Sequence, residues 1–196
     1  MIQILDDVVS PELLKELREV VRVDGTYKDD TQWDHMFSWL SPTEHASIHG
    51  KEIKNTVKGY VYEILLPLIS CLVPDQAGVE WWCNTNTGLP WHVDKDEMYY
   101  EDSGTYSLPA LSTVFYSHTS CSGGELLVAD NTPVENGYVG GDPKFRRVVT
   151  IPPATNRLVL MSPGILHRIN PIEGERYSLA VNFWNHKPVT SQRLPF

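Results

Sequence analysis

Long apolar runs are absent from this sequence, and their absence argues against a helical membrane protein. The longest apolar stretch, Ile64–Val73, is interrupted by Pro67 and followed by Pro74, whereas a membrane-spanning helix needs about 20 consecutive apolar residues. The start of the chain, Met1 to Asp7, has no basic segment and no small-residue cleavage site of the kind that marks a secretory signal. We therefore expect a cytoplasmic protein without membrane spans.

Cysteine is scarce as well. The chain has 3 cysteines, which is an odd number, and no two of them form a C-x-x-C pair. That count and spacing argue against a disulfide framework and against a cysteine zinc site. They are typical of reduced thiols inside a cell.

Basic residues are outnumbered by acidic ones. The sequence has 16 lysines and arginines against 25 aspartates and glutamates, which gives a net charge of −9. A negative field of this size repels phosphate backbones. We therefore expect no nucleic-acid partner.

What remains is an ordinary globular composition. The 196 residues are 41% hydrophobic and 21% charged, so the whole chain, residues 1–196, is predicted to form one folded domain. Residues 1–75 are predicted to be its helical part. Ser10-Pro11-Glu12 is typical of a helix start, and the helical pattern continues to about Val21. Ser41-Pro42-Thr43-Glu44 is a capping box, and it predicts a second helix towards Ile69 that Pro67 tightens or ends.

Residues 76–187 have a different character, with short runs rich in Val, Thr, Tyr and Trp between turn residues. No segment with helical length and periodicity separates these runs, which argues against an α/β sheet. The pattern predicts a mainly β fold with N-terminal helices, a cupin-like jelly roll flanked by helices. Asp96–Tyr106 and Asn131–Pro143 are predicted loops. The predicted strands are Val79–Asn84, Leu89–Asp94, Leu108–Tyr116, Glu125–Ala129, Arg146–Ile151, Arg157–Met161, His167–Ile169 and Tyr177–Trp184.

One short motif points to a metal. In His92-Val93-Asp94, on a predicted strand, the first and third side chains share a face. The motif alone is common by chance, but His167 lies 75 residues later on another predicted strand. Two histidines and one carboxylate form the facial triad typical of non-haem Fe(II), which leaves positions open for a bidentate co-substrate and dioxygen.

A second pair of residues points to a carboxylate ligand. Arg176 and Ser178 share one face of the last predicted strand. An arginine presents a planar fork of donors that matches a carboxylate, and a serine adds a hydroxyl donor. A dicarboxylate that chelates iron at one end needs such a receptor at the other end.

Taken in order, these parts resemble the Fe(II)/2-oxoglutarate-dependent dioxygenases, in their prolyl-4-hydroxylase-like branch. The resemblance covers about Val79 to Trp184. The motifs that carry it, taken together and in order, are far more specific for the family than any one of them alone. They are His92-x-Asp94, Tyr116, Gly123-Gly124-Glu125-Leu126, Asn156-Arg157-Leu158-Val159-Leu160, His167 and Gly174-Glu175-Arg176-Tyr177-Ser178.

The resemblance implies a double-stranded β-helix and an enzyme that hydroxylates its substrate while converting 2-oxoglutarate to succinate and CO2. His92, Asp94 and His167 would be the catalytic iron ligands. The implied cofactors are Fe(II), 2-oxoglutarate as co-substrate and O2, with ascorbate as a further candidate. Four residues would bind the co-substrate: Arg176, Ser178, Tyr116 and Trp82, the last at a position where relatives often carry a tyrosine.

Three differences from known subgroups of the family narrow the expected reaction. Collagen-type prolyl hydroxylases commonly have lysine where this chain has Arg176. Alkylation-repair dioxygenases have a second arginine six residues later, where this chain has Asn182. Halogenating relatives replace the carboxylate ligand with a small residue, and Asp94 is present here. Hydroxylation is therefore the expected reaction, with an oxidative demethylase of the alkylation-repair type or a non-catalytic jelly-roll binding module as alternatives.

The acidic segment after Asp94 suggests a substrate class. Asp96, Glu97, Glu101 and Asp102 begin two residues beyond a predicted metal ligand. Carboxylates at the mouth of a site favour the approach of a cation. The sequence therefore predicts a small amine-bearing molecule or a cationic peptide segment as the substrate.

Overall fold

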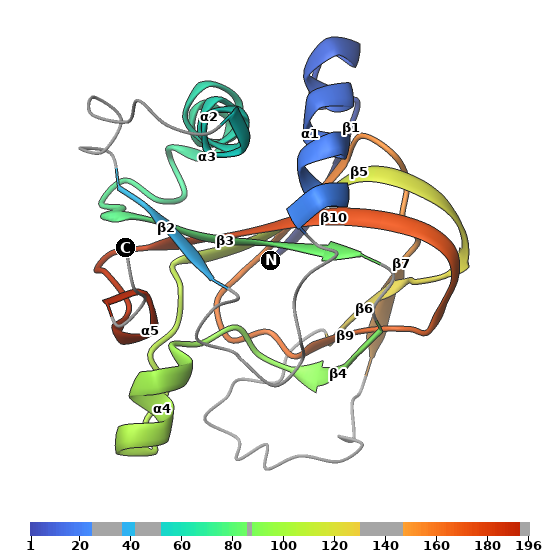
Figure 1. Ribbon diagram of the computed structural model, residues 1–196. Coiled ribbons are helices and arrows are strands. Elements are labelled where there is room, and N and C mark those ends of the chain that lie inside the picture. Colours follow the sequence, from blue (N-terminus) through green and yellow to red (C-terminus); the bar gives the residue numbers. More distant parts are fainter. Residues whose placement is uncertain (25–36, 42–51, 86–87, 130–146, 193–196) are drawn as a thin grey trace.

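The computed structural model describes residues 1–24, 37–41, 52–85, 88–129 and 147–192. Two antiparallel sheets face each other in it (Figure 1). The major sheet has the strand order β1 (Ile2–Asp6), β8 (Arg157–Met161), β5 (Leu111–Gly123), β10 (Ile172–Trp184), β3 (Gly78–Thr85) and β2 (Ser38–Leu40). The minor sheet has the order β4 (Leu89–His92), β9 (His167–Ile169), β6 (Leu126–Ala129) and β7 (Val148–Ile151). The predicted jelly roll is confirmed.

Helices cover the outer face of the major sheet, on the side away from the minor sheet (Figure 1). These are α1 (Pro11–Asp24), α2 (Glu52–Gly59), the π-helical turn η4 (Tyr60–Leu65) and α3 (Leu66–Ile69). Helix α1 begins as the sequence predicts, because the Ser10 hydroxyl oxygen accepts a hydrogen bond from the Leu13 N–H at 3.3 Å. None of the helices in the described part of the chain is long and apolar enough to span a bilayer.

The larger hydrophobic core lies between these helices and the major sheet. Leu17 of α1 and Val57 of α2 are fully buried in one cluster with Phe115 of β5 and Val181 of β10. Burying such a side chain stabilises the fold by about 1.5–3 kcal/mol. A smaller core between the two sheets includes Val128. The predicted metal ligands His92, Asp94 and His167 belong to neither of these two cores, whereas Tyr116 belongs to the smaller one.

Alternation along β10 places polar side chains on the inner face of the major sheet. Leu179, Val181 and Phe183 of β10 belong to the outer core, so Ser178, Ala180 and Asn182 face inward. Serine 178 and Asn182 are buried all the same, at 0% and 2% exposure. Buried polar side chains of this kind are stable only if they find hydrogen-bond partners.

Several boundaries differ from the sequence prediction. The edge strands β1 and β2 are additional. Strands β5 and β10 are each 13 residues long, because they pair with one another over most of their length. Pro67 does not end its helix, because the π-helical turn immediately before it accommodates the proline's missing N–H and bulky ring. The capping box at 41–44 and the loop at 131–143 fall on or extend into residues outside the described part.

The acidic segment is a helix, and not the loop that the sequence predicts. Helix α4 (Glu97–Ser103) is capped by Asp96, whose Oδ1 accepts from the Tyr99 N–H at 3.2 Å. It ends at Gly104, which adopts a left-handed conformation with φ 68°. A short helix α5 (Val189–Gln192) packs beside it. Tyrosine and aspartate have modest helix propensity, so local preference does not explain why this segment is helical. The contacts with α5 explain it.

Candidate active site

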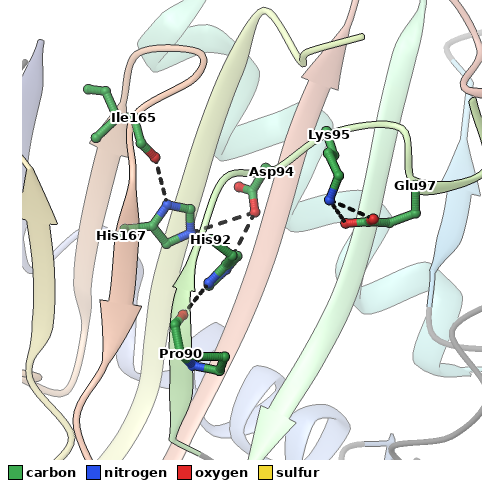
Figure 2. A network of polar contacts seen from close by, with 7 residues as sticks. All are labelled: Pro90, His92, Asp94, Lys95, Glu97, Ile165 and His167. Atoms are coloured by element: carbon green, nitrogen blue, oxygen red, sulfur yellow. Dashed lines mark hydrogen bonds and ion pairs between the residues drawn. The ribbon is translucent and has the colours of Figure 1, made fainter. Parts of the chain in front are cut away.

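Two histidines face each other across neighbouring strands of the minor sheet. His92 ends β4 and pairs with His167 of β9, and their ring centroids lie 4.2 Å apart. The Asp94 Oδ1 atom lies 3.9 Å from His92 Nε2 and 3.6 Å from His167 Nε2 (Figure 2). One ligand atom from each residue lies within 4.8 Å of the other two. Antiparallel pairing therefore brings together three ligands that one metal ion can share.

The position of Asp94 corrects one step of the sequence argument. Strand β4 ends at His92, so Asp94 does not share a strand face with it. Its carboxylate instead reaches the two imidazoles from the segment that leads out of β4 towards α4 (Figure 2). The ladder hydrogen bonds of the sheet therefore do not hold Asp94.

Backbone carbonyls fix which nitrogen of each histidine faces the carboxylate. His92 Nδ1 lies 2.8 Å from the Pro90 carbonyl oxygen, and His167 Nδ1 lies 3.0 Å from that of Ile165 (Figure 2). A carbonyl can only accept, so each Nδ1 carries the hydrogen and donates it. In the neutral imidazole the lone pair is then on Nε2, directed at the shared space. This is the arrangement that metal-binding histidines need.

The electrostatics of the pair also suit a cation. Burial and the neighbouring His167 together lower the pKa of His92 to about 4, against the opposing effect of Asp94. His92 is therefore neutral at physiological pH, as a metal ligand must be. Two imidazoles and one carboxylate that leave further positions open are the ligand set typical of non-haem Fe(II). The residues present thus fit iron.

The predicted carboxylate receptor lies on the major sheet. Arg176 and Ser178 stand on β10, and Tyr116 of β5 is the register partner of Ser178. All three are fully buried, at 0% exposure. The Arg176 guanidinium carbon lies 5.9 Å from the centre of the Tyr116 ring, and Nη1 donates to the Gly124 carbonyl at 3.3 Å. Tyr116 stands inside a long strand, and not at a strand end as the sequence prediction had it.

Two hydroxyls of this predicted receptor are buried donors. Among the described residues, neither Tyr116 Oη nor Ser178 Oγ has a hydrogen-bond partner, although both atoms are buried. Burial raises the pKa of Tyr116 to about 12, so its hydroxyl keeps its proton and is a donor. Burial also lowers the pKa of Arg176, because desolvation disfavours the charged form. A carboxylate would accept from both hydroxyls and stabilise the guanidinium charge.

Tyr116→Phe is expected to stabilise the ligand-free protein while weakening its binding of 2-oxoglutarate. A buried donor without a partner costs about 1–3 kcal/mol, and phenylalanine removes it without changing the shape of the ring. The lost hydrogen bond to the ligand should reduce affinity by about 1 kcal/mol, or roughly fivefold. Urea denaturation and 2-oxoglutarate titration of the same preparation check both effects. A variant less stable than the wild type would mean that the hydroxyl already has a partner in the ligand-free protein.

The two glycines of the predicted Gly123-Gly124 motif have backbone roles. Both have positive φ, 73° and 72°. A Cβ on Gly123 would collide with the Pro171 carbonyl oxygen, and one on Gly124 would lie 3.4 Å from Arg176 Cδ. The contact with Arg176 would be ordinary van der Waals packing, whereas Ile172 Cγ1 would lie at 3.0 Å, so the positive φ and the contact with Ile172 favour glycine at position 124.

Comparison with known proteins identifies the fold. No family model and no curated protein matches the chain. A prolyl-4-hydroxylase from Pseudomonas putida superposes with a TM-score of 0.61 over 95% of this chain and 93% of its own, at 14% identity. A prolyl hydroxylase from Trichoplax adhaerens, solved with a peptide fragment of hypoxia inducible factor, gives 0.56 over 94% and 83%, at 15% identity. HygX from Streptomyces hygroscopicus, solved with iron bound, gives 0.56 over 93% and 81%, at 12% identity.

The chain has the double-stranded β-helix fold of the 2-oxoglutarate–Fe(II) oxygenases. In this oxygenase fold the sequence-predicted residues divide between the two sheets. The three predicted metal ligands come from the minor sheet and the segment that follows β4. Arg176, Ser178 and Tyr116 come from the major sheet. Trp82 is on β3 with 9% exposure, where it pairs with Ala180 and meets the Phe37 ring edge-on at 5.1 Å.

The acidic cluster is not the uniform surface that the sequence suggests. Asp96 is 1% exposed, and backbone and hydroxyl donors of α4 and α5 occupy its oxygens, so its role in the oxygenase fold is structural. Glu97 pairs with Lys95 at 2.6 Å, although burial raises its pKa. Glu101 and Asp102 are exposed on α4. Of the four acids, only these last two are exposed.

Sequence reasoning missed a buried acid in this oxygenase fold. Glu80 of β3 is 2% exposed, pairs in register with Asn182, and accepts a hydrogen bond from the Ser191 hydroxyl at 2.8 Å. Burial, reinforced by repulsion from Asp96 and Asp94, raises its pKa to about 8. Glu80 therefore keeps its proton at neutral pH. The sequence did contain a signal. Side chains alternate along a strand, so Glu80 and Trp82 share one face of β3, and Val79 and Trp81 share the other.

Glu80→Gln is expected to remove a pH dependence of stability. Between pH 4.5 and about 8 the folded protein holds the Glu80 proton and the unfolded chain does not, so wild-type stability falls as the pH rises through that window. Relative to the glutamine variant, which keeps the oxygen that accepts from Ser191, the wild type should lose about 1.4 kcal/mol per pH unit. Urea denaturation of both proteins from pH 5 to 8 measures the difference. Parallel stability curves would contradict the assignment.

Proposed function

We propose that this protein is an Fe(II)- and 2-oxoglutarate-dependent dioxygenase. It hydroxylates an amino acid, a peptidyl residue such as proline, or a similar small molecule, and it releases succinate and CO2. One observation carries the proposal: a His92–Asp94–His167 ligand set, on the minor sheet and the segment that follows β4, accompanies a buried Arg176–Tyr116–Ser178 donor set on the major sheet. A chelating dicarboxylate needs both halves.

In this proposal the minor sheet holds the metal. His92 and His167 present Nε2 lone pairs, because their Nδ1 hydrogens are donated to Pro90 and Ile165. Asp94 supplies the negative charge that favours a divalent cation. Bound iron supplies the activation of O2 and the oxidation of the substrate, with ascorbate as a proposed auxiliary. The protein contributes two histidines whose ring orientation the backbone carbonyls already set.

The major sheet holds the co-substrate. Arg176 offers the far carboxylate of 2-oxoglutarate a guanidinium fork, and Tyr116 and Ser178 each donate a hydroxyl hydrogen. Because the Tyr116 pKa is raised to about 12, the phenol keeps its proton and orients the ligand without exchanging a proton with it. Burial of all three residues excludes water from this end of the ligand.

The comparisons favour a prolyl or other peptidyl substrate as the first class to test. Two of the similar structures are prolyl hydroxylases, and one of them holds a peptide. An oxidative demethylase of the alkylation-repair type is disfavoured by Asn182, which stands where those enzymes have a second arginine. It is also disfavoured by the net charge of −9. A binding module without catalysis would leave the Tyr116 and Ser178 hydroxyls without a purpose.

The experiment is succinate release under Fe(II), 2-oxoglutarate and air, with proline-containing peptides, free amino acids and methylated oligonucleotides as substrates. We expect stimulation above the substrate-free rate by a peptide or an amino acid, and product mass increased by one oxygen atom. Stimulation by the oligonucleotides alone would favour the demethylase. Absence of succinate in every reaction, from a protein shown to be folded, would refute the proposal.

A further inference from the structure

Helix α5 lies against the segment that follows the metal ligand Asp94, although about 95 residues separate them in the sequence. Figure 1 places α4 and α5 side by side at one end of the jelly roll. Thr190 and Ser191 of α5 are 3% and 4% exposed. A short polar helix buried to this degree must direct its hydroxyls at specific partners.

Asp96 is the partner on one side. Its Oδ1 accepts from the Thr190 hydroxyl at 2.8 Å and from the Thr190 N–H at 3.1 Å, and its Oδ2 accepts from the Val189 N–H at 2.6 Å. The Thr190 hydroxyl oxygen in turn accepts from the Met98 N–H at 3.1 Å. Asp96 thus joins the first turns of α4 and α5 through one carboxylate.

Glu80 is the partner on the other side. The Ser191 hydroxyl donates to Glu80 Oε1 at 2.8 Å, and Glu80 stands in the middle of β3, paired in register with Asn182 of β10. Helix α5 therefore bridges the major sheet and the segment that carries Asp94. We call Glu80, Asp96, Thr190 and Ser191 the α5 clasp.

The clasp matters because Asp94 has no sheet pairing of its own. Strand β4 ends at His92, so the Asp94 carboxylate is held between that strand end and the next fixed point along the chain. This point is Asp96, whose N–H donates to the Ser107 carbonyl at 2.9 Å and whose side chain enters the clasp. A shift of Asp96 would be passed to Asp94 through a single intervening residue, Lys95.

We propose that Thr190 and Asp96 are positioning residues for the metal ligand Asp94. Through the α5 clasp they hold the carboxylate at the distance from His92 and His167 that one ion can span. The inference rests on the proposed function, because it assigns the clasp to the same metal centre. Neither residue belongs to the His92–Asp94–His167 group itself.

Thr190→Val tests the proposal. Valine keeps the shape of threonine but removes the hydroxyl that bonds Asp96 and Met98. We expect the dissociation constant for Fe(II), titrated anaerobically, to rise about tenfold, the lower end of what losing an outer-shell partner costs. Thr190→Ser, which restores the hydroxyl, should return the constant to near the wild-type value.

Ser10→Ala is the matched control. It removes a comparable hydroxyl cap from α1, far from the metal centre, at a cost in stability of about 0.5–2 kcal/mol. It should lower the melting temperature and leave the Fe(II) dissociation constant unchanged. If Thr190→Val lowers the melting temperature in the same way without weakening Fe(II), the clasp is merely structural and the proposal is wrong.

A second variant covers the case in which Thr190→Val does not fold. Ser191→Ala breaks the clasp on the Glu80 side and leaves the Asp96 bonds in place, so we expect a smaller rise in the Fe(II) dissociation constant. No rise in a folded Ser191→Ala protein would then overturn the proposal. If the wild type binds no Fe(II), the proposed function is refuted as well. If the wild type binds Fe(II) and the clasp variants bind it with the same dissociation constant, only the positioning role is refuted.

Discussion

Asp94→Ala is expected to abolish Fe(II) binding and succinate release. The substitution removes the only carboxylate of the proposed three-ligand set, and with it the negative charge that faces both imidazoles. Loss of an outer-shell partner already weakens metal sites about 10–100-fold, so loss of a ligand should weaken this one by more than about 100-fold. Anaerobic Fe(II) titration and a coupled succinate assay measure the two effects.

The fold of the Asp94→Ala protein should be intact. The larger core, which contains Phe115 and Val181, does not include Asp94. Asp75→Ala is the matched control, since it deletes an exposed aspartate from the turn before β3 and should leave iron binding and activity unchanged. An Asp94→Ala protein that keeps wild-type iron content and activity would exclude this residue as a ligand.

Arg176→Ala is expected to raise the KM for 2-oxoglutarate by a factor of hundreds at saturating Fe(II). The guanidinium is fully buried beside Tyr116, and removing one partner of a buried charged pair costs about 3–5 kcal/mol. Fe(II) affinity in the absence of 2-oxoglutarate should change little, because the proposed metal ligands come from the minor sheet and the segment after β4, and not from β10. Initial rates of succinate release over a range of 2-oxoglutarate concentrations give the KM.

Two further variants sharpen the Arg176 result. Arg176→Lys keeps the charge but not the planar fork, so it should fall between alanine and wild type. Arg18→Ala removes an exposed arginine from α1 and should leave the KM unchanged. An unchanged KM in Arg176→Ala would mean that another residue anchors the co-substrate.

Local sequence patterns predicted most of the β architecture, because strand alternation is a local property. Arg176 and Ser178 could be placed on one face two residues apart, and the rule holds although the register shifts between Tyr177 and Ser178, because the extra residue of that irregularity, Ser117, is on β5 and not on β10. The same rule was applied to His92 and Asp94, and it was wrong for Asp94 because β4 ends between them. A strand end depends on its partner strand, which the sequence does not display.

The parts that could not be predicted depend on contacts between distant segments. Strand β1 is held by pairing with β8, which lies far away in the sequence. The five residues of β1 alone carry too little signal to predict a strand. Helix α4 depends on Thr190 and Val189, and these two residues convert Asp96 from an expected surface charge into a buried cap. Glu80 was overlooked for the same reason, since its burial follows from the packing of α5 against β3.

Calorimetric titration of 2-oxoglutarate under anaerobic conditions, with and without Fe(II), tests the central claim most directly. The account places the metal ligands and the carboxylate receptor on opposite sheets, where one chelating ligand links them. It predicts that Fe(II) tightens 2-oxoglutarate binding by at least about tenfold, and by reciprocity that 2-oxoglutarate tightens Fe(II) binding equally. Equal affinity with and without Fe(II), or no binding in either case, would contradict it.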